Sequence, residues 1–264
     1  MLFRRRALIH FGIVLTCALS CVWSSQIALA QRWPDEHRDP PFNYHADFQL
    51  QPYHPLLRSV TDLQHEVPKL LGIQPLDEPV HIFLFARQRT YQTYVKTYFP
   101  TVPNRPALFI KQRGPGMVFA RLSDNLAVDL RHEKTHAVLH GILPMVPLWL
   151  DEGLGEYFEV PATERANQNP HLAEAQQMAR RRTIPRIEDL EKLAELSQMR
   201  AAHYRYAWAW VHFMLHGPPE GREILISYLR DIEANIPPGK LSSRLRSQMP
   251  GYEEAFLKHF TRTQ

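Results

Sequence analysis

Cysteine is scarce in this sequence. The 264 residues contain two cysteines, Cys17 and Cys21, and both lie among the first 30 positions. From residue 31 onward the chain can therefore form neither an internal disulfide nor a zinc ribbon held by cysteine thiolates. Such a chain has to rely on its hydrophobic core, and the remaining residues, about 234, are enough to bury a large one.

Long hydrophobic runs are also lacking, apart from one near the start. The segment MLFRRRALIHFGIVLTCALSCVWSSQIALA has arginines at 4–6, an apolar run over 7–23 and the small-residue site Ala-Leu-Ala at 28–30. These are the three parts of a secretory signal, so we expect cleavage before Gln31 and an exported bacterial protein, periplasmic or secreted, without a membrane span. An uncleaved anchor is the alternative, although the run is short for a span. A lipid anchor on Cys21 is a further alternative.

A large charge of one sign is missing from the remainder. Removal of Arg4, Arg5 and Arg6 lowers the formal net charge from +4 to +1. A nearly neutral chain gives no electrostatic reason to expect a nucleic-acid partner. The oligomeric state is not indicated by the sequence.

The hydrophobic pattern divides the chain into an α+β first half and an all-helical second half. Residues 31–45, rich in proline and charge, are expected to form an extended lead-in without a packed element. An α+β lobe is expected over 46–160 and a helical lobe over 161–264, with the motif described below at their junction. The expected strands are 80–86, 107–112 and 117–122. In the first half the expected helices are 56–71, 87–99, one that contains 131–140 and ends near Gly141 and Pro144, and one that begins at Leu148. In the second half they are 171–182, 187–199, 203–216, 220–234 and 251–262.

The stretch RHEKTHAVLH, residues 131–140, contains an HExxH pattern of the kind that binds zinc. His132 and His136 are four positions apart, so a helix presents both imidazoles on one face. Glu133 lies about 100° further around the helix, where it is poorly placed as a ligand and well placed to accept a proton from a water beside the ion. The alternative is a solvated helix face without metal, next to the charged Lys134.

Two histidines do not complete a catalytic zinc site, which usually has three protein ligands. A third histidine at the HExxHxxGxxH spacing is excluded because position 142 is Ile142. His140 lies on the same face, but three successive turns of one straight helix cannot converge on a single ion. The stretch PLWLDEGLGEYFE, residues 147–159, supplies the acidic candidates. Its Glu152 and Glu156 are four apart, so both can face the motif helix.

HExxH followed by WLxEGxxEYFE resembles the gluzincin metallopeptidases, the peptidase MA-like group that includes thermolysin-type and aminopeptidase N-type enzymes. The resemblance covers about residues 80–216 and is nearest to a bacterial branch of that group. It implies a zincin-like α+β fold with the active-site helix at the junction of the two lobes. It also implies a Zn²⁺ cofactor held by His132, His136 and Glu152, with Glu133 as the general base.

The same resemblance implies two further roles. Glu156 would accept a hydrogen bond from a ligand histidine and so fix its orientation. Tyr206, in HYRYAWAWVHFML (203–215), would stabilise the oxyanion that forms during hydrolysis. Tyr204 and His203 are alternatives for this role, and packing in the core is another explanation for Tyr206.

Some residues depart from the family pattern. Lys134 is charged where an uncharged residue is commoner, and Gly155 replaces the usual alanine, which costs a helix about 1 kcal/mol. GPGMVFA, residues 114–120, occupies the place of the GxMEN run of aminopeptidase N-like enzymes but lacks its Glu and Asn, which favours an endopeptidase or another enzyme that is not an aminopeptidase. In similar proteins the strand at 117–122 lies at the sheet edge and binds substrate backbone, and an internal strand is the alternative.

The sequence therefore predicts an exported zinc metallopeptidase that acts on peptide or protein substrates. A non-catalytic, peptidase-like zinc-binding module of the cell envelope is the first alternative. Glu133 argues against it, because a purely structural site has no use for a base. A metal-free scaffold with a chance motif is the second alternative.

Overall fold

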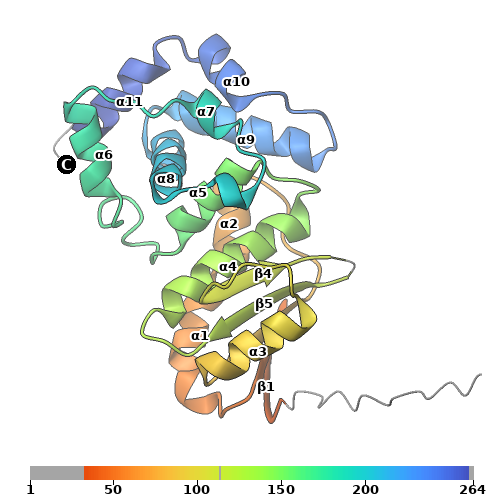
Figure 1. The fold of residues 1–264 in the computed structure, drawn as a ribbon. Helices are drawn as coiled ribbons and strands as arrows, with labels where there is room; N and C mark the ends of the chain where they lie inside the picture. The colour runs from red at the N-terminus through yellow and green to blue at the C-terminus, as the bar shows by residue number, and fades with distance from the viewer. Residues whose placement is uncertain (1–32, 113, 262–264) are drawn as a thin grey trace, which may run out of the picture. The chain divides into compact units, whose positions relative to one another are not determined.

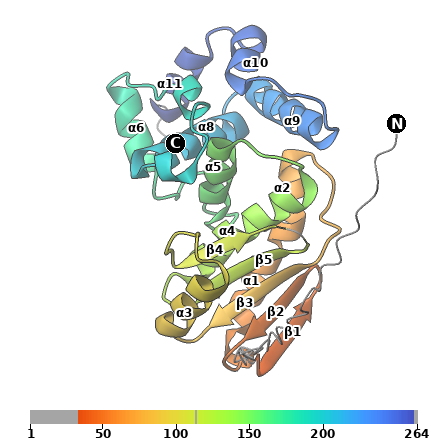
Figure 2. The ribbon, with the colours of Figure 1, turned by 45° about the vertical axis from the view of Figure 1, so that its right-hand side comes forward.

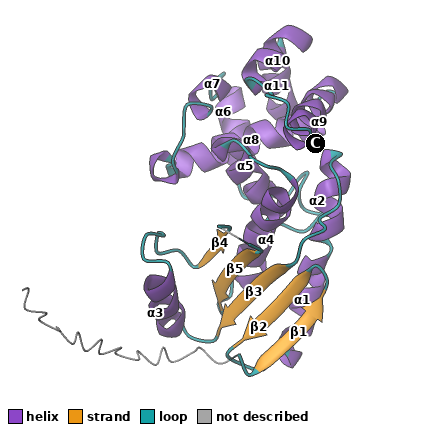
Figure 3. Cartoon of the chain, turned by 90° about the vertical axis from the view of Figure 1, so that its right-hand side faces the viewer, coloured by secondary structure: helices purple, strands orange, loops and turns teal. Residues whose placement is uncertain are grey.

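The computed structural model describes residues 33–112 and 114–261, so the predicted signal segment lies outside the described residues. The described chain contains a five-stranded sheet (Figure 1), whose strands follow the order β1-β2-β3-β5-β4 (Figure 3). The pairs β2–β3 and β3–β5 are parallel, whereas β1 and β4 are antiparallel to their neighbours at the two edges. The strands are β1 (Asp35–Asp39), β2 (Phe42–Ala46), β3 (Val80–Phe85), β4 (Ala107–Ile110) and β5 (Gly116–Arg121).

The prediction of an extended lead-in over 31–45 is wrong, because β1 and β2 occupy most of this segment. The two strands pair with each other through a turn at Pro40 and Pro41, and β2 pairs with β3. In β2 the alternate residues Phe42, Tyr44 and Ala46 are buried. The prolines thus mark a turn between strands, and the alternation in FNYHA places one face of β2 in the core.

Helices make up the rest of the described elements. They are α1 (His54–Thr61), α2 (Leu63–Leu71), α3 (Gln88–Tyr98), α4 (Leu126–Ile142), α5 (Leu148–Phe158), α6 (Leu172–Arg180), α7 (Ile187–Leu190), α8 (Ala201–His216), α9 (Pro219–Glu233), α10 (Leu241–Gln248) and α11 (Tyr252–Thr261), together with the 3₁₀ helices η1 (Gln51–Tyr53) and η2 (Leu196–Gln198).

The predicted elements agree with these assignments in most places. The strands expected over 80–86, 107–112 and 117–122, the motif helix and the helix from Leu148 are confirmed. The single helix expected over 56–71 is divided into α1 and α2, and the one expected over 187–199 is replaced by α7 and η2. Helix α10 was not expected. After β5 the described chain contains no further strand, so its later part is helical as predicted (Figure 3).

The sheet is covered by helices on both faces (Figure 3). On one face α4, α1 and α2 cover side chains such as Ile82 and Val118 of the main core. On the other face α3 covers a smaller core around Phe85 and Phe119 (Figure 2). Helix α4 is therefore held rigidly on the sheet, with Leu130 fully buried.

Strand β5 lies inside the sheet, between β3 and β4. The prediction that residues 117–122 form an edge strand is therefore wrong, and their alternative reading as an internal strand is confirmed. The strand at this edge is β4, which also contacts α4.

The main core continues from the sheet into the helices that follow. Helix α5 contacts both α4 and α8, and the same cluster of buried side chains extends from Phe42 to Phe260. The described residues from Trp33 onward accordingly form one compact unit. Among the described helices none has the length and apolarity needed to cross a membrane.

Candidate metal centre

Two neighbouring helices supply the residues of the site. Helix α4 carries His132, Glu133 and His136, and it is buried along most of its length. Helix α5 begins after Pro147 and carries Glu152 in its second turn. Because α4 packs against both the sheet and α5, the side chains that face α5 are fixed in position.

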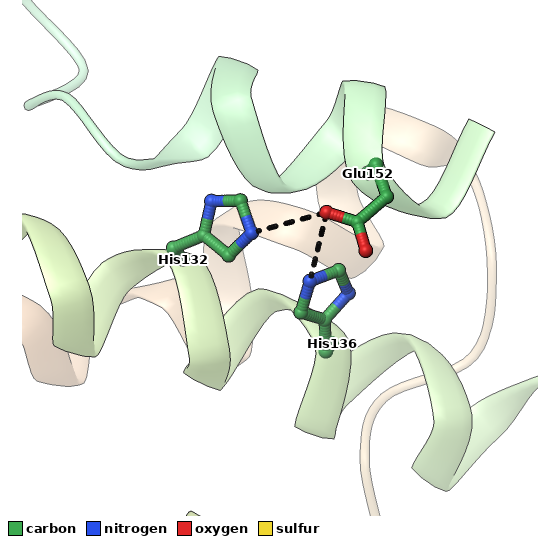
Figure 4. A group of neighbouring side chains, drawn as sticks. All are labelled: His132, His136 and Glu152. Carbon is green, nitrogen blue, oxygen red and sulfur yellow. Dashed lines mark ion pairs between the residues drawn. The ribbon is translucent and has the colours of Figure 1, made fainter. Parts of the chain in front are cut away.

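The two imidazoles converge on one carboxylate oxygen. The Nε2 atoms of His132 and His136 lie 3.6 and 4.0 Å from Oε2 of Glu152. Figure 4 shows both rings reaching from α4 toward the Glu152 oxygen on α5. One ligand atom from each of the three residues lies within 4.8 Å of the others. The structure thus brings together the three residues predicted as metal ligands.

Carboxylates hold the far sides of both imidazoles. Nδ1 of His136 lies 2.8 Å from Oδ1 of Asp151, whose Oδ2 lies 2.9 Å from Nε2 of His140. Nδ1 of His132 lies 3.3 Å from Oε2 of Glu159. Contacts of this kind fix the ring orientation and leave Nε2 as the ligand atom.

The structure corrects the predicted role of Glu156. Its Oε2 lies 2.7 Å from Nε2 of His171, and the hydrogen-bond partner of His132 is Glu159 instead. Glu156 still contributes negative charge, because its carboxylate helps to raise the pKa of His132. The ligand-orienting carboxylates Asp151 and Glu159 were not assigned this role from the sequence.

The electrostatics of the site favour a cation. Burial alone would lower the pKa of His132, but the Glu152 and Glu159 carboxylates outweigh it and hold this pKa well above its ordinary value. Burial is likewise overcome at His136, where Asp151 raises the pKa. Burial would raise the pKa of Glu152, yet the close contact with His132 and the charges of both histidines lower it. The carboxylates of Asp151, Glu152 and Glu159 thus act on the two imidazoles in the direction that favours positive charge at the site.

The donor set fits a zinc ion. Oε2 of Glu152 is buried and has no hydrogen-bond partner among the described residues, which is costly for a carboxylate oxygen unless a ligand satisfies it. Ligands at about 2.0–2.1 Å from a tetrahedral zinc lie roughly 3.3–3.4 Å from one another. The distances of 3.6 and 4.0 Å are slightly longer, so small side-chain rotations would close the set. This group of two histidines and one glutamate is compatible with zinc binding.

Glu133 lies at the edge of this group. Glu133 is 9% exposed, and its carboxylate has no hydrogen-bond partner among the residues that the structure describes. Its charge helps to raise the pKa of His132, of Arg105 and of Tyr91. A carboxylate that is near the metal group but not committed to a partner can accept a proton.

The two tyrosines considered for the oxyanion have different surroundings. The hydroxyl of Tyr204 lies 2.8 Å from Nη2 of Arg105, and the charges of Glu152 and His132 act on it. Tyr206 packs, partly buried, against the main core. The charges of two candidate ligands thus act on the Tyr204 hydroxyl, whereas Tyr206 stays a sequence-based prediction. His203 instead accepts a hydrogen bond from the backbone N–H of Arg200.

Lys134, the unusual charged residue of the motif, points away from the site. Its Nζ donates to the carbonyl oxygen of Val60 at 2.7 Å and lies 3.1 Å from the hydroxyl of Tyr44. The same Nζ lies 3.7 Å from the centre of the Phe42 ring, and burial lowers the pKa of Lys134 well below its ordinary value. Lys134 is fully buried between α4 and the sheet, so it does not occupy the space of a metal ion.

Comparison with known proteins supplies few constraints. A family described as "Protein of unknown function (DUF1570)" matches residues 127–238, a range that includes all three candidate ligands. None of the curated proteins matches the chain. Among solved structures, an M1 zinc metallopeptidase from Deinococcus radiodurans is similar to 84% of this chain, with 15% sequence identity and a TM-score of 0.35. This chain spans about half, 49%, of the length of that protein.

Proposed function

We propose that this protein is a zinc-dependent metallopeptidase that hydrolyses peptide bonds. The observation that carries the proposal is the meeting of His132, His136 and Glu152 around a buried carboxylate oxygen that has no hydrogen-bond partner among the described residues. A zinc ion held by these residues would act as a Lewis acid for a water and a carbonyl group.

The residues of this chain would divide the remaining work. Glu133 would accept a proton from the attacking water and pass it to the leaving amine, as a general base and then a general acid. Asp151 and Glu159 would hold the two ligand imidazoles in the orientation that exposes Nε2. The hydroxyl of Tyr204 would donate a hydrogen bond to the oxygen that gains negative charge.

The edge of the sheet beside α4 suits an extended peptide. Among the described strands, β4 is the last of the sheet and pairs with β5 alone. A substrate backbone could add to its free edge as a further strand. Such binding reads the backbone rather than a chain end, which supports the endopeptidase predicted from the missing GxMEN run.

Export through the signal at residues 1–30 remains part of the proposal, and so does a bacterial periplasmic or secreted location. A non-catalytic zinc-binding module of the cell envelope is the second candidate. The three metal-binding residues by themselves would suit a structural site as well as a catalytic one. The Glu133 carboxylate, which has no hydrogen-bond partner among the described residues, favours the catalytic site.

The test combines zinc content with cleavage of a mixed peptide library by the purified protein. The wild type should bind stoichiometric zinc and cleave peptides. Glu133→Gln should keep the zinc and lose activity by about 10²-fold or more. Glu152→Ala should lose the zinc, and Glu223→Gln, at an exposed position of α9, serves as the matched control.

Each contrary outcome has its own meaning. Undiminished cleavage by Glu133→Gln with unchanged zinc would refute the assigned base. Zinc without cleavage in the wild type would favour the non-catalytic module. The absence of zinc after refolding with the ion would leave only the metal-free scaffold. Comparison of Tyr204→Phe with Tyr206→Phe in the same assay would decide between the two hydroxyls.

A further inference from the structure

Arg105 links two distant parts of the chain at the edge of the metal group. It lies on the loop between α3 and β4, two positions before the edge strand begins. Its Nη2 donates a hydrogen bond of 2.8 Å to the hydroxyl oxygen of Tyr204, in the first turns of α8. The loop that leads into the proposed substrate strand is thereby joined to the helix that carries the proposed donor.

The backbone of Arg105 is fixed as well. Its carbonyl oxygen accepts a hydrogen bond of 2.8 Å from the hydroxyl of Tyr91, whose side chain is 2% exposed. Tyr91 packs in the smaller core between α3 and the sheet. Arg105 is thus anchored at its main chain by a buried residue, and its side chain is directed toward α8.

The choice of partner for this guanidinium is unusual. Glu133 and Glu152 both help to raise the pKa of Arg105, so the cation lies in the field of the site carboxylates. Among the described residues no carboxylate lies within ion-pair distance of it, and its hydrogen-bond acceptor is the neutral phenol of Tyr204. An arginine that only balanced the nearby acids would be expected to pair with one of them.

The contact has a chemical consequence for Tyr204. Its oxygen accepts from Arg105, so its own proton is available for a different acceptor. Burial and the charge of Glu152 raise the pKa of Tyr204 above its ordinary value, and the hydrogen bond and charge of Arg105, with the charge of His132, offset only part of this rise. Glu152 lies on α5, Arg105 on the loop before β4, and His132 on α4. Arg105 therefore strengthens the phenol as a donor without removing its proton.

We propose that Arg105 is a positioning residue, which holds the Tyr204 hydroxyl so that its proton is directed at the reacting oxygen of the substrate. The proposal rests on the proposed peptidase function. It assigns to the loop before the edge strand a part in the reaction as well as in substrate binding, and it requires that the effects of Arg105 act through Tyr204.

The experiment compares Arg105→Ala, Arg105→Lys, Tyr204→Phe and the Arg105→Ala/Tyr204→Phe double variant. Arg89→Ala, at an exposed arginine of α3, is the control. Arg105→Ala should lower kcat on the order of 10-fold to 10²-fold with KM little changed, because a misdirected donor is lost from the transition state. In Arg105→Ala the alkaline limb of the pH profile of kcat should move to higher pH, because Arg105 no longer lowers the pKa of Tyr204. Arg105→Lys or added guanidinium should restore part of the rate.

A second readout needs no activity. The phenol titration of Tyr204 in the zinc-free protein is obtained as the ultraviolet difference between each protein and its Tyr204→Phe counterpart. Arg105→Ala should move this titration to higher pH, and Arg89→Ala should not. In the kinetic assay, Arg105→Ala should cause no further loss when Tyr204 is already phenylalanine.

Three results would overturn the proposal. The first is that the losses in kcat caused by Arg105→Ala and Tyr204→Phe add fully in the double variant. The second is that Arg105→Ala raises KM alone and leaves the alkaline limb of the kcat profile in place, which would indicate a role in substrate binding. The third is an unchanged Tyr204 titration in Arg105→Ala. If the zinc-loaded wild type cleaves no peptide, the proposed function fails, and the titration alone then decides whether Arg105 controls the Tyr204 hydroxyl.

Discussion

At the scale of single residues, Gly155 shows that the space needed by a site residue can be incompatible with the residue that best stabilises the helix. Alanine would suit the interior of α5 better by about 1 kcal/mol. However, a Cβ at position 155 would lie 2.8 Å from Cε1 and 2.9 Å from Nε2 of His132. The ring cannot move away freely, because Glu159 holds its Nδ1. The glycine therefore leaves room for the imidazole of a proposed ligand.

We expect Gly155→Ala to bind zinc more weakly, by about tenfold or more, because displacing a ligand from its oriented position typically costs this much. The measurement is a zinc titration against a chromophoric competitor chelator. Gly221→Ala in α9 is the matched control, because a Cβ there would meet ordinary contacts at 3.4 Å or beyond. Zinc affinity equal to that of the wild type in Gly155→Ala would show that His132 is not held as described.

The positions of single residues along a helix explain which site residues could be predicted from the sequence. His132, Glu133 and His136 follow from spacing within one helix, which fixes their relative directions. The partner of His132 depends on how α5 is rotated against α4, and the sequence does not reveal whether Glu156 or Glu159 lies closer. For a similar reason it does not decide between two tyrosines that lie two positions apart on α8.

At the scale of elements, the contact between α5 and α8 depends on Gly153. A Cβ at this position would lie 2.8 Å from the carbonyl oxygen and 2.9 Å from the carbonyl carbon of Ala207. Both are backbone atoms of a buried helix and cannot rotate away. The two helices can therefore approach this closely only with glycine at 153, and α5 carries Glu152 one position earlier.

We predict that Gly153→Ala destabilises the protein by about 1–3 kcal/mol, as expected for overpacking, although alanine favours the helix. Urea unfolding followed by circular dichroism in the presence of a chelator measures this without a contribution from zinc. A second change, Ala207→Gly, should not restore stability, because the clash is with the backbone. Stability at or above that of the wild type would mean that α5 and α8 are further apart than described.

Helices and strands were predicted correctly where they depend on neighbouring residues in the sequence, and were missed where they depend on contacts between distant segments. Strands β3, β4 and β5 have strong local patterns of apolar residues, and the HExxH spacing locates α4, so their sequences suffice. The pairing of β2 with β3 joins residues 42–46 to 80–84, and no local pattern reveals it. In α10, LSSRLRSQ offers Leu241 and Leu245 as its only apolar positions, so its helical period is too weak to detect.

At the scale of the whole molecule, a buried histidine makes the packing of the later helices depend on pH. His212 on α8 is 1% exposed and contacts the carbonyl oxygen of Ala166 through Nε2 at 2.9 Å. Its Nδ1 lies 2.9 Å from Nε2 of His259 on α11. A neutral ring satisfies both contacts by donating at Nε2 and accepting at Nδ1. Burial, together with the charges of His216 and His259, lowers the pKa of His212 to about 3.

This lowered pKa predicts acid sensitivity with a definite sign. Above a pH of about 6.5 His212 is neutral in both the folded and the unfolded chain, so its contribution to stability is constant. Between about 6.5 and 3 the unfolded chain binds a proton that the folded chain does not, and the free energy of unfolding falls by up to about 1.4 kcal/mol per pH unit. His212→Gln keeps an N–H for Ala166 and removes the titration, so its unfolding free energy, measured by urea titration with chelator from pH 7 to 4, should fall less steeply. Acid effects of Asp151 and Glu152 are common to both proteins and cancel in the comparison. Equal slopes would contradict the prediction, because they would mean that the ring of His212 takes up its proton without opening the packing between α8, α11 and the loop at Ala166.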